Sequence, residues 1–131
     1  ANLLGLQDRF MLAGYIPEAS RYLSCLALYV ISSMTEGLPI SLLEAMRAKI
    51  PVVSTKVGGI EDVLDGGAAG IVVPPREPEA LAEGLLRMLS DMEAREPMVA
   101  RAAETFERRF SSTVMASNYI NTYAALIRIK R

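Results

Sequence analysis

The chain has 131 residues, the size of a single domain with a substantial core. Its 14 basic and 15 acidic residues leave a net charge of -1, so the charge does not favour nucleic acid as a partner. Because the sequence has no histidine and one cysteine, it excludes Ser-His or Cys-His catalysis, histidine-ligated zinc and an internal disulfide within this chain.

The hydropathy and the cysteine content of the sequence indicate the cellular compartment. Hydrophobic residues make up 51% of the sequence, but charge, glycine or proline breaks every apolar run before the roughly 20 residues needed to span a bilayer. No signal peptide is visible, and one cysteine fits a reducing compartment, so we expect a cytoplasmic protein. Cys25 lies in an apolar stretch and is predicted to be a buried structural thiol rather than a nucleophile.

In chain order, strands alternate with helices up to residue 75, and only helices follow. Pro17 opens a helix, residues 65–70 form a turn, and Pro97 separates a short turn from the helix after it. The predicted strands cover residues 9–14, 28–32, 51–55 and 71–73, and the predicted helices cover residues 1–5 (a helix end), 17–26, 60–64, 77–90, 98–110 and the tail from Ser111 or Ser112. This order indicates an α/β fold, a doubly wound parallel sheet with a helical C-terminal tail.

Several apolar sets in these helices are predicted to pack in the core. They are the stripe Leu81, Leu85 and Leu89, the face Met115, Tyr119, Thr122 and Leu126, the methionines Met88, Met92 and Met98, and Tyr123.

Residues 35–51, TEGLPISLLEAMRAKIP, are the strongest candidate for a site. An apolar run over residues 26–31 enters this stretch, and an amphipathic helix with Leu42, Leu43 and Met46 on one side leaves it. A turn that follows a strand lies at the carboxyl end of the sheet, where open α/β sheets bind ligands. Proline at the first helical position suits a helix start, whose free amides attract an anion such as phosphate.

Two carboxylates, Glu36 and Glu44, flank this anion-attracting helix start. Neither suits a phosphate, but both accept hydrogen bonds from hydroxyl groups. A ligand with sugar hydroxyls on both sides of a phosphate satisfies the whole arrangement. The pattern therefore favours a nucleotide sugar.

Simpler interpretations exist for the same residues. Ser41 and Glu44 have the spacing of a capping box that only closes the helix start, and Glu36 can be a solvated loop residue. The pair Gly58 and Gly59 can cradle a phosphate or, more commonly, form a turn, because it lies in neither a GxGxxG motif nor a P-loop.

An ordered series of segments carries a family resemblance. SSMTEGLPISLLEAM, then IPVVSTKVGGIEDVLDGGAAGIVVPP, then EPEALAEGL resemble the C-terminal, donor-binding domain of retaining glycosyltransferases with the GT-B fold, the family 4 group. The likeness runs from LGLQDRFMLAGY to FSSTVMASNYINTYAAL. It implies a Rossmann-like half of a GT-B fold and an enzyme that transfers a hexosyl-type sugar from a nucleotide diphosphate sugar to an acceptor, with retention at the anomeric carbon.

The resemblance also implies roles for individual residues. Glu36 contacts and orients the transferred sugar, and Glu44 holds the nucleotide ribose. Base contacts come from the loop around Tyr15 and Ile16, where uridine and guanosine are not distinguished. The backbone amides expected along the sugar and diphosphate belong to Gly37, Leu38, Leu42 and Leu43. No metal or other cofactor is implied, in agreement with the absence of an Asp-x-Asp motif.

The family pattern has parts that this sequence lacks. In the family, the domain begins with another βα unit that carries a glycine-rich turn, an Arg and a Lys further on neutralise the diphosphate, and an N-terminal domain binds the acceptor. Residues 1–131 are therefore expected to be a partial donor-binding domain, inactive alone and prone to self-association through an open sheet edge. A peripheral membrane enzyme with a lipid acceptor is compatible with the family, but the charge gives it no support.

Two other functional classes remain open at this stage. One is a non-catalytic assembly module that kept the fold, although retention of both glutamates argues against it. The other is a GT-B relative of another reaction type, a sugar-nucleotide epimerase or a phosphorylase.

Overall fold

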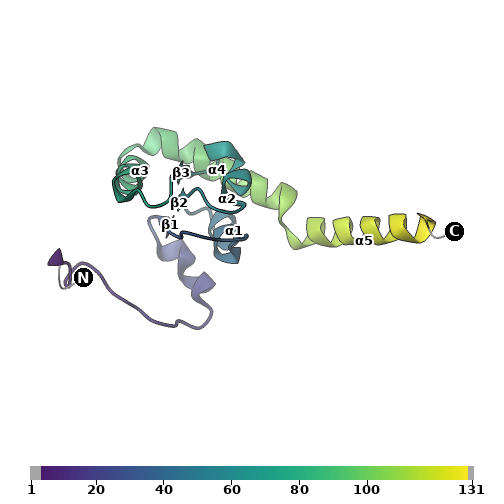
Figure 1. Cartoon of the computed structure of the whole chain (residues 1–131), viewed down its shortest axis with the longest axis horizontal. Coiled ribbons are helices and arrows are strands. Elements are labelled where there is room, and N and C mark those ends of the chain that lie inside the picture. Colours follow the sequence, from purple (N-terminus) through teal and green to yellow (C-terminus); the bar gives the residue numbers. More distant parts are fainter. Residues whose placement is uncertain (1–3, 130–131) are drawn as a thin grey trace.

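The computed structural model describes residues 4–129. Its centre is a parallel sheet in the order β1-β2-β3, with β1 over Tyr29–Ile31, β2 over Val52–Thr55 and β3 over Ile71–Val73 (Figure 1). The α/β fold and these three strands are confirmed. The helix end predicted for residues 1–5 falls largely outside the described residues.

Strand β2 lies between the other two strands, and all four of its residues are buried. Tyr29 pairs with Val52, and Thr55 pairs with Val73. Parallel strands are covered on both faces, which is why the successive residues Val52 and Val53 are both buried, and Ser54 and Thr55 are buried after them.

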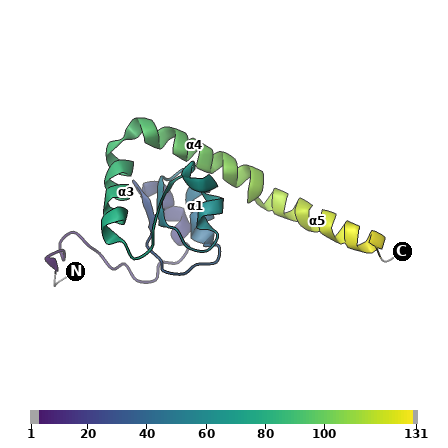
Figure 2. The same ribbon diagram turned by 45° about the horizontal axis from the view of Figure 1, so that its top comes forward.

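Helices cover both faces of the sheet (Figure 2). On one face α1 (Ile40–Arg47), α2 (Ile60–Val63) and α4 (Met92–Arg109) pack in a core with Leu42, Met46, Val52, Ile60 and Leu64. The 3-10 turn η3 (Asp65–Gly67) follows α2 within the predicted turn. On the other face lies α3 (Pro78–Ser90).

Helix α3 approaches the sheet closely through Gly84. A Cβ there would lie 3.1 Å from the Ile71 side chain and 3.3 Å from that of Val53. Gly84 and Met88 are buried, whereas Leu89 is 49% exposed. The predicted burial of Leu89 is therefore wrong. The helix packs on the strands through the face that contains Gly84 and Met88, and Leu89 lies outside that face.

Helix α4 is continuous, so the predicted break at Pro97 is wrong and Met92, 56% exposed, begins the helix outside the core. Pro97 has no amide hydrogen, so α4 lacks one backbone hydrogen bond there. The contacts described next stabilise the helix in spite of this loss. Asp91 caps the helix by accepting from the Ala94 amide at 2.9 Å.

Two ion pairs fasten α4 to the segment around α2. Arg101 Nε donates to Asp65 at 2.7 Å, and Arg109 Nη2 lies 2.6 Å from Asp62. The hydrogen bond and charge of Asp65 raise the pKa of the Arg101 guanidinium above its ordinary value.

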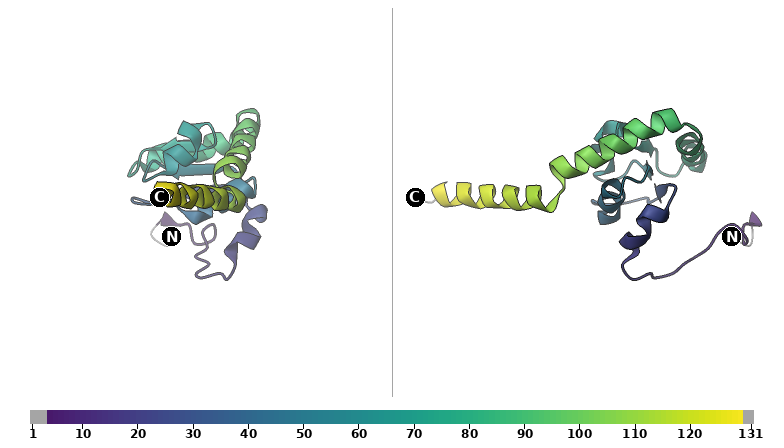
Figure 3. Two further views of the ribbon diagram at one scale, coloured as in Figure 1. Left: turned by 90° about the vertical axis from the view of Figure 1, so that its right-hand side faces the viewer. Right: turned by 180° about the vertical axis from the view of Figure 1, so that it is seen from behind.

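Helix α5 (Ser112–Ile129) runs out from the body (Figures 1 and 3). Its cap is confirmed, because the Val114 amide donates to Ser111 Oγ at 3.4 Å. Its predicted core face is wrong, since Met115, Tyr119 and Tyr123 are each more than half exposed, and Leu126 is exposed as well. Over residues 4–129, no helix is both long enough and apolar enough to cross a membrane.

The segment before the sheet departs from prediction. Residues 9–14 are not a strand, because no described strand pairs with them, and the segment runs free of the body (Figure 3). The helix predicted over residues 17–26 is a 3-10 helix, η2 (Ala19–Cys25). Only Leu23 of η2 is buried, so Cys25 is exposed and its predicted burial is wrong.

Helix α1 ends in a Schellman motif. The Ile50 amide donates to the Ala45 carbonyl at 3.0 Å, and the Lys49 amide donates to that of Met46 at 3.1 Å. Lys49 has a left-handed backbone with φ 57°, the position that glycine usually fills.

We expect Lys49→Gly to raise the free energy of unfolding by about 1 kcal/mol, because glycine adopts this backbone without a Cβ penalty. Urea denaturation measures the change. Lys49→Ala keeps a Cβ and should bring no gain, and a loss of stability in Lys49→Gly contradicts the prediction.

Candidate functional site

The turn between β1 and α1 lies at the carboxyl end of the sheet, as predicted for the site. Within it, Glu36 is half-buried, and its Oε1 accepts a hydrogen bond from Ser33 Oγ at 2.7 Å. The Ser33 carbonyl in turn accepts from Thr55 Oγ1, also at 2.7 Å, at the end of β2. Glu36 is therefore held by partners and is not a freely solvated loop residue.

A second turn, Gly58 and Gly59 between β2 and α2, supports the backbone of the Glu36 turn. The Gly59 amide donates to the Gly37 carbonyl at 3.1 Å. Gly58 has φ 53°, and a Cβ there would overlap the Glu36 carbonyl oxygen and lie 2.7 Å from that of Gly37. In this structure the glycine pair is thus a brace for the turn.

The turn presents amides that no described partner engages. Within residues 4–129, no hydrogen bond is formed by the amides of Gly37, Leu38, Ile40 or Ser41, and Pro39 between them has no amide hydrogen. Gly37, Leu38 and Ile40 are exposed. Amides at the start of a helix, at the positive end of its dipole, attract an anion.

Two details of this helix start differ from prediction. Pro39 is the residue before the helix, with no side-chain cap, and Ser41 lies inside it, so the capping box is wrong. The Leu42 amide, expected along a diphosphate, already donates to the Pro39 carbonyl at 3.1 Å, and the Leu42 side chain is fully buried. The amides of Ile40 and Ser41, just before Leu42 in the chain, have no described partner.

Glu44 is half-buried and lines a cavity of about 320 Å³ between α1 and η2. The other lining residues are Ser20, Arg21, Arg47 and Ala48. Arg21 is paired with Glu18 at 2.6 Å. Among the described residues, no hydrogen bond or ion pair reaches the Glu44 carboxylate, which leaves both of its oxygens as acceptors for a ligand.

The structure does not gather Tyr15 and Ile16 with the glutamates. Tyr15 is 92% exposed and Ile16 is 41% exposed, in the free segment that leads into η2. Pro17 and Glu18 connect this segment to Ser20 and Arg21 of η2, which line the Glu44 cavity.

Two further features adjoin the turn. A groove of about 390 Å³ separates the helix start from α5, and its lining includes Leu38, Ile40, Leu43, Phe110 and Tyr119. Beside the glycine pair, Lys56 Nζ lies 2.8 Å from Glu61. Leu43 thus faces this groove and is only partly buried.

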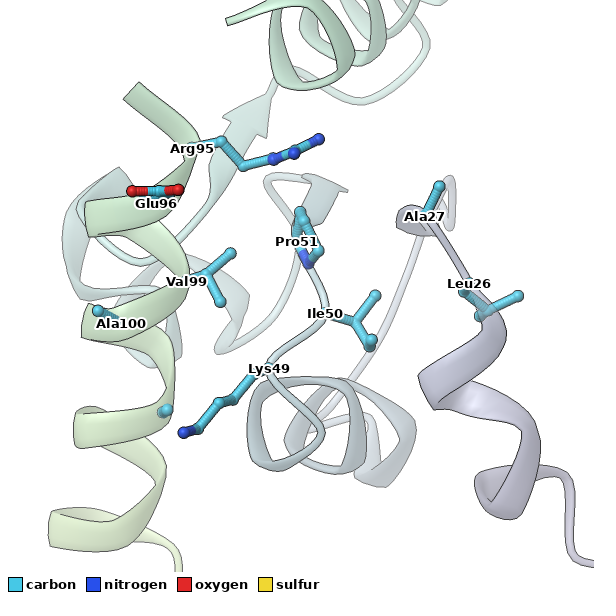
Figure 4. A pocket seen from close by; sticks show the side chains of 10 residues that line it. Leu26, Ala27, Lys49, Ile50, Pro51, Arg95, Glu96, Val99 and Ala100 are labelled. Atoms are coloured by element: carbon cyan, nitrogen blue, oxygen red, sulfur yellow. The ribbon is translucent and has the colours of Figure 1, made fainter. Parts of the chain in front are cut away.

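A cavity of about 640 Å³ lies at the opposite edge of the sheet (Figure 4). Its lining includes Leu26 and Ala27 before β1, and Ile50 and Pro51 before β2, so it is at the amino ends of the strands. Figure 4 shows the Arg95 side chain extending across this cavity near Pro51. Because open α/β sheets bind ligands at their carboxyl ends, the smaller features around the turn are the candidate site.

Sequence reasoning missed Ser33, Thr55 and the amides of Ile40 and Ser41. The amides could have been found from the sequence, because the first amides of any α-helix have no hydrogen-bond partner within the helix and Pro39 marks the helix start. The hydrogen bond from Thr55 to Ser33 joins the end of β2 to the loop after β1, and no local spacing in the sequence reports it.

Comparisons with known proteins show which family this chain is similar to. The profile of the family described as Glycosyl transferases group 1 matches residues 1–91. Alpha-D-kanosaminyltransferase from Streptomyces kanamyceticus is 31% identical over 121 residues, which cover 91% of this chain and 31% of that protein. This chain spans about a third of the length of such relatives.

Solved structures share the fold. Sucrose-phosphate synthase from Thermosynechococcus elongatus has a TM-score of 0.87 at 25% identity, covering 98% of this chain and 33% of that one. HepE from Anabaena, solved in complex with UDP, has a TM-score of 0.88 at 22% identity, covering 95% of this chain and 34% of that one. With the profile matched across the strands and the turn, this chain belongs to the glycosyl transferases group 1 family.

Proposed function

We propose that this chain is the donor-binding part of a retaining glycosyltransferase. The intact enzyme would transfer a hexosyl-type sugar from a nucleotide diphosphate sugar to an acceptor bound mainly by another domain. The observation that carries the proposal is the set of amides without described partners between Gly37 and Ser41, which lies between Glu36 and Glu44 in the chain. Both carboxylates are able to accept hydrogen bonds from hydroxyls. The cytoplasmic location expected from the sequence belongs to the same proposal.

Different residues of the site would bind different parts of the nucleotide sugar. The amides of the turn and of Ile40 and Ser41 would face the diphosphate, where the helix dipole stabilises the negative charge of the departing nucleotide. Glu36 would accept hydrogen bonds from hydroxyls of the transferred sugar and orient it. No step of this scheme requires a metal or cofactor.

The nucleoside is assigned to the Glu44 cavity. Glu44 would accept from the ribose hydroxyls, since its oxygens have no described partner. The arginines of the cavity add donors beside it. Tyr15 and Ile16 would reach the base if their segment folds back over the cavity. In support of this donor class, HepE, which has a similar fold, was also solved with UDP-glucose.

A titration tests the proposal. We expect uridine, guanosine or adenosine diphosphate sugars, added to the isotopically labelled chain, to shift amide resonances centred on residues 37–44. The base that binds identifies the nucleotide. Glu44→Ala should weaken binding by roughly tenfold, because a hydrogen bond to a charged group is lost.

Glu79→Ala is the matched control, since this exposed carboxylate lies in the first turn of α3. Shifts that survive unchanged in Glu44→Ala, or that centre on the cavity at the amino edge of the sheet, contradict the proposed site. If the folded chain binds none of the donors, the same titration on the full-length protein distinguishes a need for further residues from loss of donor binding.

The chain alone is predicted to be catalytically inactive and to self-associate. Among the described residues the outer edge of β1 has no partner strand, Val30 on it is 41% exposed, and Phe10, Met11 and Leu12 in the free segment are exposed. Unpaired edges and apolar surface favour strand addition or exchange. Light scattering should give a molar mass that rises with concentration, whereas a constant 14.2 kDa would count against self-association.

A further inference from the structure

The hydrogen bonds around Glu36 determine the direction in which its carboxylate points. Ser33 Oγ donates to Oε1 of Glu36 at 2.7 Å. This bond occupies one carboxylate oxygen, and no hydrogen bond of the described residues engages the other, Oε2. The bond to Oε1 thus orients the carboxylate and leaves Oε2 as the oxygen with no described partner.

Ser33 is itself positioned from the neighbouring strand. Thr55 Oγ1 donates to the Ser33 carbonyl at 2.7 Å and lies 3.5 Å from the Ile31 carbonyl. Thr55 is 4% exposed, so water does not compete effectively for its hydroxyl. The end of β1 is thereby tied to the end of β2 at the residue that holds Glu36.

We propose that Thr55 and Ser33 form a positioning relay that presents Oε2 of Glu36 to the hydroxyls of the transferred sugar. The inference rests on the proposed function and deepens it, because it assigns the sugar contact to one oxygen and names the two residues that aim it. Ser33 and Thr55 touch no substrate atom and act through Glu36. Preorganised acceptors gain affinity because less rotamer freedom is lost when the ligand binds.

The first test needs no ligand. Three-bond couplings from the backbone nitrogen and carbonyl carbon to Cγ of Glu36 report whether its side chain occupies one rotamer. We expect a single rotamer in the unmodified chain and averaged couplings in Ser33→Ala and Thr55→Val. The conservative variants Ser33→Thr and Thr55→Ser keep a hydroxyl and should restore the single rotamer. Couplings that stay fixed in Ser33→Ala overturn the relay.

The second test compares UDP with UDP-glucose as probes and uses the ratio of their dissociation constants. If Glu36 is aimed by the relay, Ser33→Ala should reduce the gain in affinity that the glucose provides by roughly fivefold to tenfold while leaving UDP binding unchanged. Ser90→Ala, which removes an exposed hydroxyl in α3, is the remote control. A general loss of structure would weaken both probes equally.

The two ideas fail in different ways. If Glu36→Gln lowers the glucose-dependent gain and Ser33→Ala does not, the relay is wrong and the donor site stands. If Glu36→Gln also has no effect, or if neither this chain nor the full-length protein binds either probe, the proposed function is what fails. The coupling measurement still decides whether the relay orients Glu36.

Discussion

Gly58→Ala is expected to lower the free energy of unfolding by about 3 kcal/mol and to weaken donor binding by more than tenfold. The residue has φ 53°, so any Cβ carries a conformational cost of about 1 kcal/mol. The new methyl group would also overlap the Glu36 carbonyl and approach that of Gly37 to 2.7 Å. Because these are backbone atoms, relief requires the turn itself to move.

The matched control is Gly66→Ala. Gly66 has a similar φ of 64°, but a Cβ there meets nothing within 4 Å. It should therefore carry only the conformational cost and leave donor binding intact. Urea denaturation and the donor titration measure both variants. Equal stability losses for the two variants would falsify the claim that Gly58 braces the turn.

Leu42→Ala is expected to lower the free energy of unfolding by about 3 kcal/mol, from the range found for large-to-small changes in cores. Leu42 is fully buried in the cluster formed by α1, α2, α4 and the sheet, so its truncation would leave a cavity among packed side chains. Urea denaturation measures the loss.

Leu86→Ala provides the comparison for Leu42→Ala, since Leu86 is 67% exposed on α3. Its effect should stay within about 0.5 kcal/mol. If Leu42→Ala is as mild as Leu86→Ala, then α1 is not held to the sheet by the apolar contacts described here.

Short apolar runs with clear punctuation were predictable from the sequence. Strand β3 was predicted at its observed bounds because Gly70 precedes it and Pro74 follows it. Residues 9–14 have a similar apolar pattern, yet they form no strand. A strand needs a neighbouring strand to bond its backbone amides and carbonyls. The local sequence does not show whether such a neighbour is present.

Errors in the helices have the same origin. A proline inside a helix is costly, but the Asp91 cap and the ion pair of Arg101 with Asp65 act on α4 from outside the local sequence around Pro97. The exposed faces of Cys25 and Tyr119 likewise depend on what packs against η2 and α5.

At the candidate site, the turn chemistry and the family resemblance predict the location and the two carboxylates, and these stay predictions. Of the predicted amides, that of Leu42 already donates to the Pro39 carbonyl, a bond within the helix start that the spacing of residues does not report. The contact of Gly58 with Glu36 and the Thr55 bond to Ser33 join segments that are distant in the chain. Such contacts follow from the parallel pairing of β1 with β2 and cannot be read from spacing.

The brace has a consequence for how the protein is made. Synthesis proceeds from the N-terminus, so the ribosome releases the Glu36 turn before β2 and the glycine pair that hold it. Strand β1 has no described partner other than β2, and Ser33 receives its bond from Thr55. A nascent chain that has not yet exposed Gly59 thus carries Glu36 in a turn without its supporting bonds, and the site can assemble only after the second strand has left the ribosome.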